Sequence, residues 1–343
     1  MTLTALFYLV VFGFGLIKSI AGKPIWGLYI YFFCFYFHAP SQWWGQALPD
    51  LRWSLIASAV TLFSLILYPP KLGFRFWKFR ENKFLLLFAL FVVAQLGFSL
   101  NSTAHSEYVE LLLKFLFFIF LLQNAVSTKK DIEGIIWANL LGCTFLAYLG
   151  LSTHSGGRLE GIGTPGMESA NQLGQHFALV ILMSAYLLLE KLRWVHVVIA
   201  GCLSLMLMAL FLTESRGVLL SLIATGGIAS FFIPVGTKKK FSTFAILALL
   251  ASSMLMGPQI LARFQGVEDN ANGEMSDRSA QSRVEILRAQ FEMFKDSPWV
   301  GHGHRGTLLL SPFYISEEYL TKSKGLTVRA SHNVAAAFFV DHG

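Results

Sequence analysis

Long apolar runs alternate with short polar segments along most of this chain. A helix rises 1.5 Å per residue, so a run of about 17 to 20 apolar residues crosses roughly 30 Å of hydrocarbon. Nine runs of 16 to 19 residues reach or come close to that length: 4–20, 53–69, 84–100, 108–126, 132–150, 172–189, 195–213, 217–234 and 242–257. The run 25–38 is shorter but rich in aromatic residues. Counting it, we predict ten membrane spans.

The polar segments between these runs predict an orientation. Basic residues concentrate on alternate loops: Lys18, Lys23, Lys71, Arg75, Lys78, Arg80, Lys83, Lys129, Lys130, Lys191, Arg193, Lys238, Lys239 and Lys240. The opposite short loops carry Arg52, Arg158 and Arg216. Because loops rich in Lys and Arg stay on the cytoplasmic side, we expect these three arginines and the N-terminus on the outer face.

The composition supports a membrane protein. Of 343 residues, 55% are hydrophobic and 14% charged, which excludes an ordinary soluble globular domain. The net charge of +7 could suggest nucleic acid, but the basic residues lie between apolar runs, so we expect membrane lipid and no nucleic acid as a partner. Cys34, Cys143 and Cys202 lie inside apolar runs without zinc or disulfide spacing, which predicts buried thiols.

Three parts are therefore expected: a transmembrane bundle of about ten helices over 1–257, an outer-face segment over 258–331, and the start of a further span over 332–343. The last stretch has twelve residues, too few to cross a bilayer. We therefore expect the chain to stop inside an eleventh span. The predicted fold class is an all-α polytopic membrane protein with one larger helical segment on its outer face.

The outer segment contains a predicted amphipathic helix over 283–296. Ser282 and Glu285 have the spacing of a capping box, and Pro298 ends the helical pattern. Apolar residues recur at helical spacing: Val284, Leu287, Phe291 and Phe294.

Three arginines are candidate anion ligands. Arg283 falls in the first turn of the predicted helix, where its charge opposes the positive end of the helix dipole, and a bound anion would relieve that conflict. Arg216 lies between two apolar runs, and Arg158 lies in an outer loop. The alternatives are a solvated surface charge for Arg283, an interface anchor for Arg216 and ordinary loop polarity for Arg158.

His332 is the candidate general base. It stands where the outer segment meets an apolar run, and an imidazole with a pKa near 6.5 exchanges protons readily at neutral pH. The alternative is an interfacial histidine bonded to the backbone. His302 and His304 in a glycine-rich turn are weak evidence for a metal, and we predict neither a metal nor a cofactor. No nucleotide-binding fingerprint occurs, so an enzyme here needs a substrate that carries its own leaving group.

Together, Ser215-Arg216-Gly217, the stretch from Ser282 to Pro298 with Gly301 and Gly303 behind it, and Ser331-His332-Asn333 resemble the O-antigen ligase and polymerase superfamily. The early stretch Pro40-Ser41-Gln42-Trp43 and the long outer loop are more specifically similar to O-glycosylation ligases associated with exosortase A systems.

The resemblance implies an inverting GT-C-like glycosyltransferase of the bacterial inner membrane with its active site facing the periplasm. Its donor would be a glycan on a polyprenyl diphosphate carrier, and its acceptor a hydroxyl on a protein, lipid or polysaccharide. His332 would be the base. Arg216, Arg283 and Arg158 would bind the diphosphate without a metal.

Two other classes remain open. A Wzy-type polymerase would use the same donor and nearly the same residues. A transporter or flippase of lipid-linked sugars would bury ionisable groups near the middle of the membrane, whereas the candidate groups here gather on the outer face.

Overall fold

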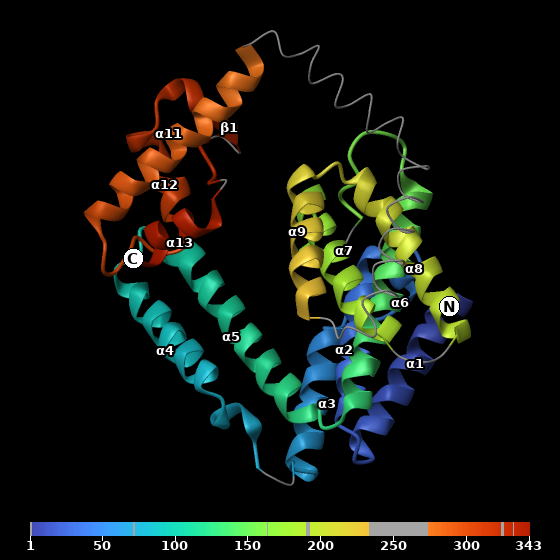
Figure 1. Cartoon of the computed structure of the whole chain (residues 1–343). Helices are drawn as coiled ribbons and strands as arrows, with labels where there is room; N and C mark the ends of the chain where they lie inside the picture. Colours follow the sequence, from blue (N-terminus) through green and yellow to red (C-terminus); the bar gives the residue numbers. More distant parts are fainter. Residues whose placement is uncertain are drawn as a thin grey trace. The chain divides into compact units, whose positions relative to one another are not determined.

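A computed structural model describes residues 2–70, 73–162, 164–189, 193–232, 274–323, 326–331 and 333–343. Nine of the ten predicted apolar runs contain a helix (Figure 1): α1 (Leu3–Ile20), α2 (Ile25–Tyr36), α3 (Trp53–Leu67), α4 (Arg80–Ala94), α5 (Ser102–Ala125), α6 (Lys129–Thr153), α7 (Ala170–Ala185), α8 (Arg193–Leu212) and α9 (Arg216–Phe232). The tenth run, 242–257, lies outside the described residues.

Short 3-10 helices join or extend these elements: η1 (Ala39–Ser41), η2 (Gly45–Ala47), η3 (Arg75–Lys78), η4 (Gln95–Gly97), η5 (Tyr186–Leu189) and η6 (Glu317–Tyr319). Within the described ranges, four helices are long and apolar enough to cross a membrane, namely α1, α5, α6 and α8. The helices α3 and α9 are apolar but shorter. On α1, Phe7, Val10 and Ile17 are mostly exposed, as expected of side chains that face lipid. The chain is a polytopic helical membrane protein.

The chain divides into two compact units. One comprises Met1–Phe74 and Leu121–Ile260, and the other Arg75–Phe120 and Leu261–Gly343. The helix α4 and most of α5 therefore belong to the same compact unit as the C-terminal segment.

In the first unit, α2 packs against α1, α3 and α6. Glycines make the close approach possible, since a Cβ on Gly27 would collide with Thr61 of α3 and a Cβ on Gly142 with Tyr36 of α2. A second core joins α6, α7 and α8 through side chains such as Leu140, Phe177 and Met206, all fully buried. The three cysteines are free and buried, which confirms the prediction for them.

In the second unit, α11 (Glu274–Asp296) packs against α12 (Gly306–Tyr314) and α13 (Val334–His342). Ile286, Ala289 and Met293 of α11 form a small core with Ile315 and Val340. A two-stranded antiparallel hairpin, β1 (Thr321–Ser323) and β2 (Leu326–Val328), is a small exception to the predicted all-α class.

The predicted start of the amphipathic helix is wrong. Helix α11 begins at Glu274, and Ser282 is a buried residue within it instead of its cap. The stretch 274–281 contains neither Gly nor Pro, so nothing in it ends a helix. The predicted end at 296 is confirmed.

The predicted apolar face of this helix is confirmed only at Phe294, which packs against the small core. Val284, Leu287 and Phe291 are about half exposed, while the face with Ile286 and Met293 is buried. Helix α11 carries two apolar stripes, and α12 and α13 cover the one that helical spacing alone did not single out.

Candidate functional site

Ser331 and Asn333, the sequence neighbours of the predicted base, are joined by two hydrogen bonds. His332 itself lies outside the described residues. Ser331 Oγ donates to the Asn333 carbonyl at 2.7 Å and accepts the Asn333 backbone N–H at 3.0 Å. Asn333 is the N-cap of α13, and its Oδ1 accepts the Ala336 N–H at 3.1 Å. Ser331 and Asn333, which flank His332 in the sequence, are thus held at the start of α13.

Gln290 of α11 reaches this turn from the buried side. Its Nε2 donates to Ser331 Oγ at 2.8 Å and lies 3.4 Å from Thr307 Oγ1 of α12. The side chain is 1% exposed. Its Oε1 is buried, and the described residues supply no hydrogen-bond partner for it.

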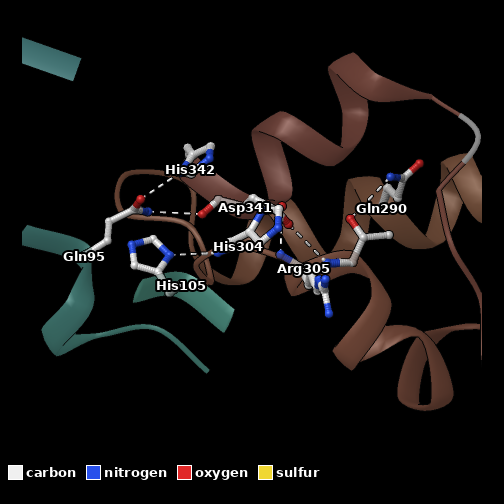
Figure 2. A network of polar contacts seen from close by, with 8 residues as sticks. Gln95, His105, Gln290, His304, Arg305, Asp341 and His342 are labelled. Carbon is white, nitrogen blue, oxygen red and sulfur yellow. Dashed lines mark hydrogen bonds and ion pairs between the residues drawn. The ribbon is translucent and has the colours of Figure 1, made fainter. Parts of the chain in front are cut away.

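Thr307 belongs to a larger polar network that Figure 2 shows, centred on Asp341 near the end of α13. One carboxylate oxygen accepts the Arg305 N–H at 3.1 Å and the other the Thr307 N–H at 3.3 Å. These N–H groups belong to the first turn of α12, where an anion is stabilised by the helix dipole. Arg305 has the left-handed conformation, with φ of 66°, just before the helix.

Gln95, at the start of η4, ties α13 to the end of α4. Its Nε2 donates to the carbonyls of Val300 and, at 3.1 Å, Asp341. Its Oε1 lies 2.7 Å from His342 Nδ1. Because the amide NH₂ faces two carbonyls, the oxygen must face His342, and the imidazole must therefore carry a proton at Nδ1.

His105 of α5 joins the same network. Its Nδ1 accepts the backbone N–H of His304 at 2.9 Å, so its proton is on Nε2, which donates to the Val92 carbonyl at 2.8 Å. The side chain is fully buried and, with both nitrogens committed in this way, neutral. Tyr108 stacks on the His304 ring at 4.5 Å and on the His342 ring at 5.4 Å. We call Gln95, His105, His304, Asp341 and His342 the polar cluster.

His304 is the most accessible imidazole of the polar cluster, with its side chain 32% exposed. Burial lowers its pKa, and the positive charge of Arg305 lowers it further, while Glu107 acts in the opposite direction. Its Nδ1 is 3.9 Å from an Asp341 oxygen, too far for a strong hydrogen bond.

His302 does not behave as a metal ligand, because its Nε2 is bonded to the Met293 carbonyl at 2.8 Å. Among the residues that the structure describes, no group of three or more His, Cys, Asp or Glu is arranged to hold a metal ion.

Arg283 lies nine residues after the first residue of α11 and its side chain is exposed. It is therefore far from the helix N-terminus, and the predicted conflict with the helix dipole does not exist. The guanidinium is free to meet an anion from solvent, but the backbone N–H groups of that terminus do not converge with it.

Arg158 and Arg216 both belong to the first unit. Arg158 donates through Nε to the Thr213 carbonyl at 3.2 Å and through Nη2 to Asn171 Oδ1 at 3.3 Å. The next residue, Leu159, donates its backbone N–H to the Leu212 carbonyl at 2.8 Å. The loop that carries Arg158 is thereby joined to the α8–α9 turn. Arg216 is the first residue of α9, and its side chain is not described.

Sequence reasoning missed Gln95, His105, Gln290 and Arg329. The Arg329 N–H donates to Ser311 Oγ at 2.8 Å, and its Nε is buried without a partner in the described ranges. A signal was available for Arg329, an arginine three residues before the predicted base. Gln95, His105 and Gln290 lie in apolar or amphipathic helical patterns that do not reveal their partners.

The helices thus define a multi-pass membrane protein with an extended polar network near its C-terminal end. Residues 201–343 match the family model described as O-antigen ligase, Wzy_C. The matched stretch contains α9, α11, α12, α13 and the Ser331–Asn333 turn. No curated protein and no solved structure matches the chain. The C-terminal part of the chain is therefore similar to the O-antigen ligase family.

Proposed function

We propose that this protein is an inverting GT-C-like ligase of the bacterial inner membrane. It moves a glycan from a polyprenyl diphosphate carrier to an acceptor hydroxyl on the periplasmic face. The O-antigen ligase match over residues 201–343 carries the proposal, because that stretch includes Arg216, Arg283 and His332.

His332 is the proposed general base. The acceptor oxygen attacks the anomeric carbon on the face opposite the diphosphate, and its proton passes to the imidazole as the anomeric C–O bond breaks. One displacement inverts the anomeric configuration. The hydrogen bonds of Ser331 and Asn333 support this role, since they fix the two residues that flank His332 in the sequence.

The arginines are proposed to stabilise the leaving diphosphate. Charge builds on its oxygens as the glycosidic bond breaks, and a guanidinium binds two of them through paired N–H groups. Arg216, Arg283 and Arg158 have this role in the proposal, and no metal or cofactor is required. The exposure of the Arg283 side chain supports it, because a solvent-accessible guanidinium can reach a bulky donor.

We further propose a protein hydroxyl as the acceptor. The resemblance of Pro40-Ser41-Gln42-Trp43 to O-glycosylation ligases associated with exosortase systems supports this choice over a lipid or a polysaccharide. A Wzy-type polymerase would use the same donor but extend a polysaccharide chain.

The test is transfer from a polyprenyl diphosphate glycan by the full-length protein in liposomes, with donor loss and product size followed together. Wild type should attach single glycan units, His332→Ala should attach none, and EDTA should leave the rate unchanged. His154→Ala, in an outer loop of the first unit, is the control and should retain transfer. Transfer by His332→Ala would remove the base assignment, and laddered products would identify a polymerase. An absence of donor consumption by wild type, with sugar crossing the bilayer, would identify a transporter.

A further inference from the structure

The buried face of α11 contains one amide side chain among apolar neighbours. Gln290 is 1% exposed and follows Ile286 and Ala289, with Met293 one turn further on. Burying an amide costs roughly 1 to 3 kcal/mol unless its groups are hydrogen-bonded. A methionine would fill the same space without that cost, so we expect the amide to have a specific role.

The NH₂ group of this amide faces the Ser331 hydroxyl. The Ser331 proton is committed to the Asn333 carbonyl at 2.7 Å, so Ser331 Oγ accepts from Gln290 Nε2 at 2.8 Å. The same Oγ also accepts the Asn333 N–H at 3.0 Å. Through one hydroxyl, Gln290 therefore constrains the residues on both sides of position 332.

With Nε2 directed at Ser331, Oε1 is buried and has no partner among the described residues. Such an unmet acceptor costs roughly 1 to 3 kcal/mol. Unpaired buried groups of this kind persist where a ligand or a reacting group completes the bond.

We propose that Gln290 is a positioning residue for the base His332: its Nε2 holds the turn through Ser331, and its Oε1 accepts a hydrogen bond from an N–H or O–H donor when the site is loaded. This inference rests on the proposed function. Gln290 acts on the reaction through its neighbours, because a histidine works as a base only when its ring is held with the correct nitrogen toward the acceptor hydroxyl.

Two substitutions separate this role from simple packing. Gln290→Met keeps the volume and removes both polar groups, and we expect kcat to fall about 10- to 100-fold with KM for the donor nearly unchanged. Gln290→Glu keeps an acceptor and adds a negative charge, which favours the imidazolium. The acidic limb of the pH profile of kcat/KM should then shift to higher pH by about one unit.

The matched control is Gln281→Met, the same chemical change at an exposed position of α11, which should behave as wild type. Ser331→Ala and the double variant Gln290→Met/Ser331→Ala test the path. If Gln290 acts through Ser331, the double variant should lose little more activity than the worse single variant. Thermal unfolding of each purified variant shows whether it is folded. If Gln290→Met does not fold, the pH profile of Gln290→Glu decides.

The inference would be overturned if Gln290→Met kept the wild-type kcat and Gln290→Glu left the pH profile unshifted. It would also be overturned if the fold-losses in kcat of the two single variants multiplied in the double variant. The proposed function fails separately. In that case wild type transfers nothing, or His332→Ala still transfers, and the inference falls with it. Loss of transfer in His332→Ala with unaffected Gln290 variants removes the positioning role alone.

Discussion

The side chains of Gln95 and His342 are joined by a 2.7 Å hydrogen bond across 247 positions of the chain. Gln95 simultaneously donates to the carbonyls of Val300 and Asp341. One buried amide therefore connects three separate backbone stretches of the C-terminal unit, and the first predictions concern this connection.

Gln95→Leu should destabilise the protein by about 3 kcal/mol, because two buried carbonyls and one imidazole N–H lose their partner and each unmet group costs roughly 1 to 3 kcal/mol. Chemical denaturation in detergent measures this loss. Gln46→Leu, at an exposed position, is the control and should change stability by less than about 0.5 kcal/mol. Equal effects of the two substitutions would mean that the Gln95 bonds contribute nothing net.

Gly301→Ala should be much more damaging than Gly161→Ala. Both glycines have nearly the same left-handed backbone, with φ of 69° and 68°. A Cβ at position 161 meets open space, whereas one at position 301 collides with the backbone of Asp341 and His342. Strain alone should cost Gly161→Ala about 1 kcal/mol. Gly301→Ala should lose at least about 3 kcal/mol or fail to fold, as thermal unfolding and size-exclusion profiles will show. Similar losses would refute the close contact.

Stability should fall as the pH is lowered below about 6.5, in part because of His304. Its pKa is lowered in the folded protein, chiefly by burial and then by the positive charge of Arg305, although Glu107 opposes this and Asp341 lies nearby. The unfolded chain therefore binds the proton more tightly, so acid favours unfolding from the unfolded pKa downward. His304→Gln should flatten the dependence of unfolding midpoint on pH between about 7.5 and 5.5. A slope as steep as that of wild type would assign the effect to other groups; His154→Gln serves as the control.

Arg158→Lys should lower transfer more than stability. Its two hydrogen bonds, to Thr213 and Asn171, are made by an exposed side chain, so their loss should cost less than about 1 kcal/mol. If the guanidinium also binds the diphosphate, the lysine should reduce turnover at least tenfold, since a point charge replaces paired N–H groups. The liposome assay and an unfolding curve on the same preparation compare the two losses. If turnover falls only as far as the loss of folded protein accounts for, Arg158 has a structural role alone, which is to link its own loop to the α8–α9 turn.

Much of the helical architecture was predictable from sequence. Each of the first nine apolar runs contains a helix, including the short aromatic run that became α2. The end of α11 at Asp296, just before Pro298, also agrees with the pattern. The start of α11 was not predicted correctly, because a capping-box sequence in the middle of a helix looks the same as one at its beginning. Most of its buried face was also missed, because the helix has two apolar stripes and the sequence does not show which of them packs against the core.

The sequence by itself determined the placement of the nine described apolar helices, the absence of a cysteine framework, and the similarity of residues 201–343 to the O-antigen ligase family. These depend on local quantities: the length of an apolar run, the spacing of residues and the order of short motifs. Tertiary structure alone decided that Gln95 and His105 meet His342 and His304, and that Gln290 reaches Ser331. A polar side chain in an apolar pattern has the same sequence signature with or without a partner, and its partner is set by how distant helices pack.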